Sequence, residues 1–384
     1  MEAHPSTLMI LMTAISVLIQ GFVATNIDDK HLSWERRLEI INKPATKSFM
    51  TEYGDILDCV DIKKQYAFDH PLLKNHSIQM RPSGFIGRRS SLKAVSHVLP
   101  KHMRCPQGTV PIKRIQKEDL LMEKMLQRPT LFLASNVSYN DGNREVAGIG
   151  AFNTNMGASG SINVWNPQVG AGQYSAACIY TAKEDNSVTN AIQTGWMVSP
   201  VVYPNNTETR LYAYWTKDSG KTTGCFNILC PGFVQVSKKT YLGQVISPVS
   251  KRIDKQYFID LEISQDMRTK NWWLKFFGEP VGYWPPSLFT TLAGGAARVG
   301  WGGEIYSPGI GTSPEMGSGY LGEDHSYLQV CLMKDLKMLA PQLFPQRQDI
   351  KYFMTNPASY SVAYNYNYEW KNYIFFGGPK KPTS

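Results

Sequence analysis

Beyond about residue 129 the chain is divided into short apolar runs separated by polar turns, and this pattern constrains the fold more than any other feature. Clusters such as NPQVGAGQ (166–173) and KDSGKTTG (217–224) are rich in turn-forming residues. The charged fraction of 18%, together with 31 glycines and 23 prolines, suits strands and turns better than helices. Many short strands joined by turns predict an antiparallel β-sandwich over residues 129–384. The runs are TLFLASNVSY (130–139), GASGSINVW (157–165), QYSAACIYTA (173–182), AIQTGWMVSP (191–200), TRLYAYWT (209–216), YFIDLEISQD (257–266) and NWWLKFFG (271–278).

The part of the chain before residue 129 has a different character and is predicted to be a smaller, helix-containing segment. Apolar residues recur at helical spacing in residues 31–43 and again in residues 116–128, and a proline follows each run. Residues 54–112, which lie between them, are polar and are predicted to be irregular. The whole chain is therefore expected to be mainly β, with its helices concentrated near the N-terminus.

Residues 8–24 form an apolar run that ends in small residues, as the hydrophobic part of a signal peptide does. A membrane anchor is the alternative, but the run is short for one. We expect a signal peptide over residues 1–24, secretion, and no membrane span once it is cleaved. Secretion would make three Asn-x-Ser/Thr tripeptides candidate glycosylation sites, at Asn75, Asn136 and Asn205.

Six cysteines can form disulfides in an oxidising compartment. Cys225 and Cys230 are close enough in sequence for a local bridge. Cys59 and Cys105 are expected to pair within the N-terminal part. Whether Cys178 and Cys331 pair is left open by the sequence.

Several classes of function fit the sequence poorly. The formal charge of +9 suggests nucleic-acid binding, but the basic residues are scattered and do not interleave with a stacking platform. A Ser/His or Cys/His mechanism would have to use His325, because the other six histidines precede the predicted β domain, and no Gly-x-Ser-x-Gly motif is present. No metal-ligand spacing and no phosphate-binding loop are present either, so we expect no metal and no cofactor.

Glu304 is the carboxylate that strand periodicity singles out. In the strand-like run RVGWGGEIYSP (298–308), alternate residues place Glu304 on one face with glycines and Tyr306. Trp301 and Ile305 point to the other face. The glycines leave a hollow beside the carboxylate, which indicates either a substrate site or a side chain that points into water.

Gln193 lies in a second run of the same kind. In AIQTGWMVSP it shares a face with Gly195, while Trp196 lies opposite. Two strands thus each present one polar side chain among small neighbours and bury a tryptophan behind it. A pair of outward-facing residues is the alternative to a site.

Long motifs in this chain are similar to those of a known protein family. Residues 47–83 and CPQGTVPIKR (105–114) resemble the activation segment of plant neprosin-type proteins. Further segments of this chain resemble the catalytic-domain signatures of the family: GWMVSP, YWTKDSGKTTGCFNILCPGFVQ, NWWLKFFGEPVGYWP and WGGEIYSP. The resemblance therefore covers nearly the whole chain after the predicted signal peptide.

The resemblance implies a secreted zymogen, extracellular or apoplastic. Residues 25–128 would form an activation propeptide that inhibits its own chain until cleavage between KRIQK and Pro129, and residues 129–384 the neprosin catalytic domain. The family's activity implies a glutamic endopeptidase that cleaves proline-containing peptides in acid with two glutamates, of which the second matches Glu304. This chain has Gln193 at the first position, and the fungal glutamic peptidases use a glutamine–glutamate pair of this kind.

The pair suggests a division of labour. Glu304 would act as general base and then general acid, and Gln193 would orient the water and donate to the oxyanion. Candidates to line a pocket for a proline ring are Tyr214, Trp215, Tyr306 and Trp196, with core packing favoured for the tryptophans. The alternative is a catalytically inactive secreted sandwich that binds cell-wall glycans or proteins, because the altered pair removes one carboxylate.

Overall fold

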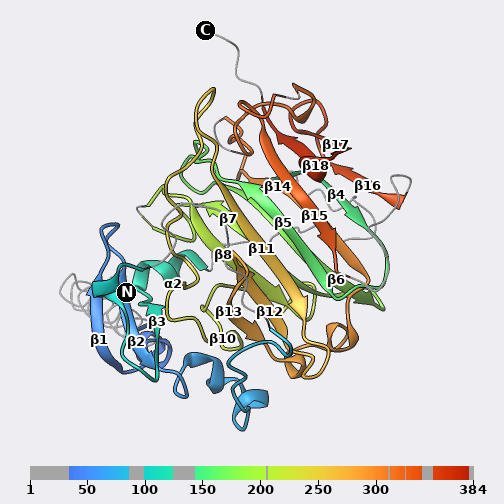
Figure 1. Cartoon of the computed structure of the whole chain (residues 1–384). Coiled ribbons are helices and arrows are strands. Elements are labelled where there is room, and N and C mark those ends of the chain that lie inside the picture. Colours follow the sequence, from blue (N-terminus) through green and yellow to red (C-terminus); the bar gives the residue numbers. More distant parts are fainter. Residues whose placement is uncertain are drawn as a thin grey trace, which may run out of the picture.

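The computed structural model describes residues 34–85, 99–123, 143–204, 206–309, 312–324, 326–339 and 349–379. Two large antiparallel sheets pack against each other over these residues, as Figure 1 shows. The predicted antiparallel β-sandwich is therefore confirmed. The predicted run at 130–139 lies outside the described residues.

The first large sheet has seven strands and carries both Glu304 and Gln193. Its two longest strands are joined by Asn186 and Ser187, both of which have positive φ, as the central residues of a tight two-residue hairpin do. Its strands, in spatial order, are β16 (Lys351–Met354), β4 (Arg144–Ala151), β14 (Arg298–Tyr306), β6 (Tyr174–Asp185), β7 (Val188–Val198), β8 (Arg210–Thr216) and β9 (Cys225–Phe226).

The second large sheet has eight strands and covers one face of the first. Its strand β11 alternates buried and half-buried residues, so that Ile259, Leu261 and Ile263 face the core. Its strands, in spatial order, are β10 (Val234–Gln235), β13 (Glu279–Trp284), β12 (Trp272–Phe276), β11 (Phe258–Gln265), β5 (Gly157–Asn163), β15 (Cys331–Met338), β18 (Lys371–Gly377) and β17 (Ser361–Asn367). Short 3-10 helices η4 (Pro286–Leu288), η5 (Leu292–Gly294) and η6 (Gly322–Asp324) lie in its connections.

Tryptophans from the first sheet tie the two sheets together. Trp196 donates its indole N–H to the carbonyl of Asn163 at 2.8 Å, and Trp301 donates to that of Ser159 at 3.0 Å. Both acceptors belong to β5 of the opposite sheet. These bonds satisfy two buried indole N–H groups and link β7 and β14 to the opposite sheet.

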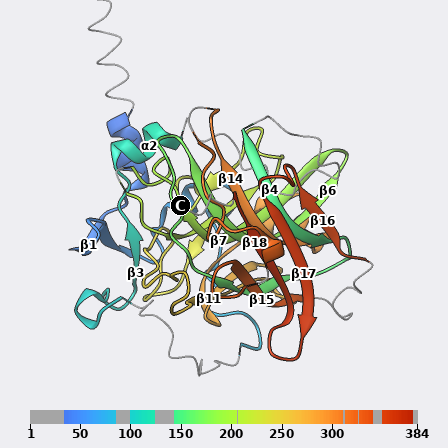
Figure 2. The same cartoon turned by 90° about the horizontal axis from the view of Figure 1, so that it is seen from above.

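The N-terminal part forms a separate three-stranded sheet with short helices, and both views place it to one side of the sandwich (Figures 1 and 2). Its elements are a helix at 34–41, β1 (Ala45–Met50), β2 (Ile56–Asp61), η1 (Tyr66–Asp69), η2 (Pro71–Leu73), η3 (Lys101–Met103), β3 (Thr109–Lys113) and α2 (Lys117–Glu123).

The N-terminal predictions are correct for the helices and wrong for the segment between them. The helix at 34–41 lies within the predicted 31–43, and α2 lies within the predicted 116–128. Residues 54–112, predicted to be irregular, contain β2 and β3. The sequence of β2, ILDCVD, does not alternate because its four central residues are buried, and one of its two strand partners, β3, is distant in the chain.

Both predicted disulfides are present, Cys59–Cys105 and Cys225–Cys230. Cys178 and Cys331 are buried free thiols in different sheets, so they do not pair. Among the predicted glycosylation sites Asn75 is exposed, whereas Asn136, Asn205 and the predicted signal peptide lie outside the described residues.

Within the described ranges, no helix combines the length and apolar character needed to cross a membrane. The same part of the chain holds no group of three or more His, Cys, Asp or Glu side chains that could bind a metal ion.

Candidate active site

Glu304 and Gln193 lie on the same face of the seven-stranded sheet, opposite the core. In the register of the sheet Glu304 pairs with Ala176 of β6, and Gln193 pairs with Tyr180 of the same strand. Even-numbered residues of β14 and β6 and odd-numbered residues of β7 share this face. Both side chains are buried, each with an exposed fraction of 1%.

A row of small side chains separates the carboxylate from the carboxamide. Gly302, Cys178 and Gly195 pair side by side on β14, β6 and β7, between the rows of Glu304 and Gln193. A methyl group at either glycine would collide with the backbone of the adjacent strand, so the strands approach too closely there for any side chain. In this row the Cys178 thiol is therefore the side chain that lies between the two polar groups on these three strands.

The carboxylate of Glu304 is held by groups from neighbouring strands. The Tyr174 hydroxyl donates a hydrogen bond to Oε1, and Arg144 Nε lies 3.9 Å from the same oxygen. Tyr306 stacks on Tyr174 with ring centroids 5.7 Å apart, and the Arg144 guanidinium lies 5.1 Å from the Tyr306 centroid. Burial, followed by the charge of Glu304, raises the pKa of Tyr174 well above its usual value, so this hydroxyl remains a donor.

The carboxamide of Gln193 is positioned by Tyr212 of β8. Its Nε2 donates to the Tyr212 hydroxyl at 2.5 Å, while its Oε1 has no hydrogen-bond partner among the described residues. Burial and then the charge of Glu304 raise the pKa of the Cys178 thiol, and hydrogen bonds with Tyr212 and Gln193 oppose the rise. Cys178 therefore interacts with the charge of Glu304 and with the side chain of Gln193.

The N-terminal part covers this face. One hydrophobic cluster contains Tyr174 and Tyr212 from the sheet and also Ile41, Ile115 and Leu120 from the N-terminal part. These three aliphatic side chains are each at most 6% exposed. The candidate site is therefore sealed from water in the intact chain.

The predicted pocket residues divide between the two faces of the sheet. Tyr214 pairs with Gln193, and Tyr306 shares the face of Glu304. Trp196 and Trp215 instead belong to the core between the sheets, so their assignment to a pocket is wrong and the core packing favoured for tryptophans is correct. On the core side of the sheet, the Trp215 ring packs edge-on against the ring of Phe289.

Sequence reasoning missed the residues that hold the pair in place: Arg144, Tyr174, Cys178 and Tyr212. Tyr174 and Cys178 stand at even spacing in the predicted strand QYSAACIYTA, which is a signal that they share a face. Only the strand order shows that this face is the one that Glu304 occupies.

A β-sandwich whose buried carboxylate–carboxamide face lies under its own N-terminal part has the organisation of a hydrolase precursor. The chain belongs to the Neprosin family: the Neprosin family model matches residues 171–379, and the model of the Neprosin activation peptide matches residues 48–137. The resemblance seen in the motifs is thereby confirmed. An activation peptide joined to a neprosin domain is the arrangement of a peptidase zymogen.

Two solved structures of scytalido-glutamic peptidase are similar at a low level. One holds a transition state analog inhibitor, with a TM-score of 0.32, 10% identity, and coverage of 62% of this chain and 98% of the other. The second holds a peptide based transition state analog, with a TM-score of 0.25, 11% identity, and coverage of 62% and 97%.

Proposed function

We propose that this chain is the secreted precursor of a glutamic endopeptidase that cleaves proline-containing peptides in acid. The observation that carries the proposal is the placement of Glu304 and Gln193 on one buried face, separated by a row of glycines and Cys178. The residues of the activation peptide that cover this face explain how the peptidase is kept inactive before processing.

Glu304 is the group that moves protons in this proposal. As a carboxylate it takes a proton from water while that water attacks the peptide carbonyl, and as a carboxylic acid it returns the proton to the leaving nitrogen. Tyr174 and Arg144 hold one carboxylate oxygen, which fixes the orientation of the carboxyl group. A single carboxylate is enough for both transfers because they occur in sequence.

Gln193 supplies the electrostatic stabilisation in the proposed mechanism. Its carboxamide has an acceptor oxygen that can orient the water and N–H groups that can donate to the developing oxyanion. Tyr212 fixes the carboxamide from one side. When the amide turns by half a rotation, Tyr212 donates to Oε1 and Nε2 becomes available to the substrate.

Proline recognition rests on the aromatic side chains that share this face. Tyr306 is half-buried at the rim of the site beside Arg144, and Tyr214 lies next to Gln193. A proline ring packs well on such a surface because it is apolar and rigid. The two tryptophans in the core take no part.

The test is cleavage of a proline-containing quenched peptide by the acid-treated secreted protein, from about pH 3 to about pH 7, beside Glu304→Gln. We expect the variant to lose at least about 100-fold in rate, the usual range for a general acid–base group. Glu262→Gln is the matched control, because Glu262 pairs with Lys275 on the other sheet, and it should retain the wild-type rate.

Absence of cleavage by the wild-type protein, with cleavage restored by Gln193→Glu, would overturn the proposal. That result would mean that this protein keeps the fold but lacks catalytic activity. It would favour the alternative function, the binding of cell-wall glycans or proteins.

A further inference from the structure

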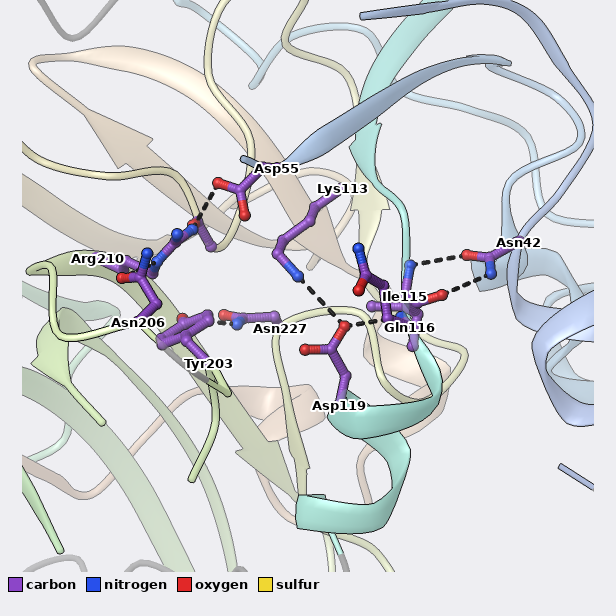
Figure 3. A network of polar contacts seen from close by, with 11 residues as sticks. Asn42, Asp55, Lys113, Ile115, Gln116, Asp119, Tyr203, Asn206, Arg210 and Asn227 are labelled. Atoms are coloured by element: carbon purple, nitrogen blue, oxygen red, sulfur yellow. Dashed lines mark hydrogen bonds and ion pairs between the residues drawn. The ribbon is translucent and has the colours of Figure 1, made fainter. Parts of the chain in front are cut away.

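Arg210, the first residue of β8, is a buried cation at the contact between the activation peptide and the neprosin domain (Figure 3). Its side chain is 1% exposed. Its Nη1 donates to Oδ2 of Asp55 at 2.6 Å and to the carbonyl of Gly243 at 2.7 Å, and its Nε donates to Oδ1 of Asn206 at 3.2 Å. The guanidinium carbon lies 5.0 Å from the ring centroid of Tyr203.

The partners of Arg210 come from two parts of the chain. Tyr203, Asn206 and Gly243 lie in the neprosin domain and carry no charge. The carboxylate comes from Asp55, which lies in the activation peptide. Removal of that peptide takes away this carboxylate and uncovers a guanidinium that neutral groups hold in position.

Space for a ligand exists beside the guanidinium. A cavity of about 140 Å³ is lined by Arg210 and Tyr203 on one side and by Asp55, Lys113 and Asp119 of the activation peptide on the other. Lys113 pairs with Asp119 at 3.3 Å, so both of these charges leave with the same segment. The charge that remains on the wall is that of Arg210.

Arg210 lies on the same face of the sheet as Glu304. In the register Arg210 pairs with Met197, Met197 with Ala176, and Ala176 with Glu304, so one row crosses four adjacent strands. Three strand spacings amount to about 14 Å, a span that an extended peptide covers with about four residues. A substrate bound at Glu304 can therefore reach Arg210.

We propose that Arg210 forms a carboxylate-binding subsite of the mature peptidase, which Asp55 occupies in the zymogen. The inference rests on the proposed peptide cleavage and names its substrate class: proline-containing peptides with an acidic residue about four positions from the cleaved bond. Asp55 then blocks the subsite as a mimic of the substrate side chain.

The first experiment compares the cleavage of two quenched peptides that differ only by Glu or Gln at the fourth position from the cleaved bond, tested on each side. At about pH 5.5 the glutamate is ionised, and we expect the processed wild-type enzyme to prefer it by on the order of tenfold in kcat/KM. Arg210→Gln should abolish the preference, so that the ratio of kcat/KM for the Glu and Gln peptides falls to about one. Arg252→Gln removes a more exposed arginine that pairs with Glu315, and it should keep the preference.

A second readout does not depend on catalysis. A thrombin site inserted between residues 124 and 142 allows the zymogen to be cut while both pieces stay associated. Release of the labelled activation segment is then measured with each peptide added, in a Glu304→Gln background. We expect the Glu peptide to speed release more than the Gln peptide, and Arg210→Gln to remove that difference. Asp55→Asn should speed release without any added peptide.

The two readouts separate the subsite from the proposed function. If no peptide is cleaved, the proposed function fails, and the release assay still decides the subsite. In the protein that retains Arg210, equal effects of the Glu and Gln peptides on release of the activation segment would overturn the proposed subsite. Equal kcat/KM values for both peptides with the wild-type enzyme would overturn it as well.

Discussion

The hydroxyl of Tyr174 donates a hydrogen bond to Oε1 of Glu304, although the two residues are 130 positions apart in the sequence. They come from adjacent strands, β6 and β14, and both are almost fully buried. A hydrogen bond to the ionised form of a carboxyl group favours that form. In the proposed mechanism Tyr174 is therefore a positioning residue for Glu304.

We expect Tyr174→Phe to move the acid limb of the pH–rate profile to higher pH by about one unit, because the carboxylate loses a charge-assisted hydrogen bond. Activity should fall most below about pH 4 and recover toward neutral pH. A pH–rate profile of the processed enzyme checks this shift. Tyr306→Phe, which removes the hydroxyl of the ring stacked on Tyr174, is the matched control. A uniform loss at every pH would show that Tyr174 acts only on the structure.

Gln193→Glu should change the shape of the profile. A second carboxylate on the same face would titrate together with Glu304, so that the like charges raise one of the two apparent pKa values. Because Gln193 does not titrate, we expect the wild-type enzyme to lack this coupled limb and the variant to gain it. The measurement is kcat/KM against pH for both proteins, and identical profiles would contradict the expectation.

The contact between His76 and Tyr283 indicates that acid weakens the binding of the activation peptide to the neprosin domain. His76 Nε2 lies 2.8 Å from the Tyr283 hydroxyl of the neprosin domain, and burial lowers the pKa of His76 from 6.5. The released segment then binds more protons than the docked one. The docking contribution is present above about pH 6.5 and is lost as the pH falls below that value, through the lower pKa of the docked histidine.

The thermal midpoint of the Glu304→Gln zymogen, which cannot process itself, measures this contribution between about pH 5 and about pH 7. We expect His76→Gln to make the pH dependence shallower over that range. An unchanged slope would exclude His76 as one of the groups that respond to acid.

Asp266 adds a second component at lower pH. Burial acts to raise its pKa, but hydrogen bonds from Ser83 and Gln79 of the activation peptide, and from its own turn, hold the pKa well below 3.8. A depressed carboxyl pKa contributes stability above the ordinary value, and this is lost as the pH falls below about 3.8. Asp266→Asn should remove this component, measured as the midpoint between about pH 2 and about pH 4.

Trp301 tests the assignment of faces, because it lies on the strand of Glu304 but points into the core. Trp301→Phe removes the donor to the Ser159 carbonyl and part of a large side chain. We expect a loss of about 1–3 kcal/mol in the free energy of unfolding. Urea unfolding of the zymogen measures it, while kcat/KM of the processed enzyme should be unchanged at temperatures where the variant is folded. A loss of activity there would mean that the core side of β14 also shapes the site.

Features that depend only on neighbouring residues could be predicted from the sequence. The two-residue period of a strand placed Glu304 opposite Trp301 and Gln193 opposite Trp196, and both placements hold in the structure. The Cys225–Cys230 bridge spans five positions, so sequence proximity was enough to predict it. Turn clusters and short apolar runs predicted the antiparallel sandwich, because each depends on neighbours within a few residues.

Tertiary structure decided everything that depends on which strands are adjacent. That Glu304 and Gln193 share one face follows from β6 lying between β14 and β7. The contact of Asp55 with Arg210 joins residues 155 positions apart. The strands within residues 54–112 were missed for the same reason, since their burial comes from packing against distant parts of the chain. A sequence specifies the face on which each side chain lies, but strand order and register determine which faces meet, because the contacts that stabilise them are non-local.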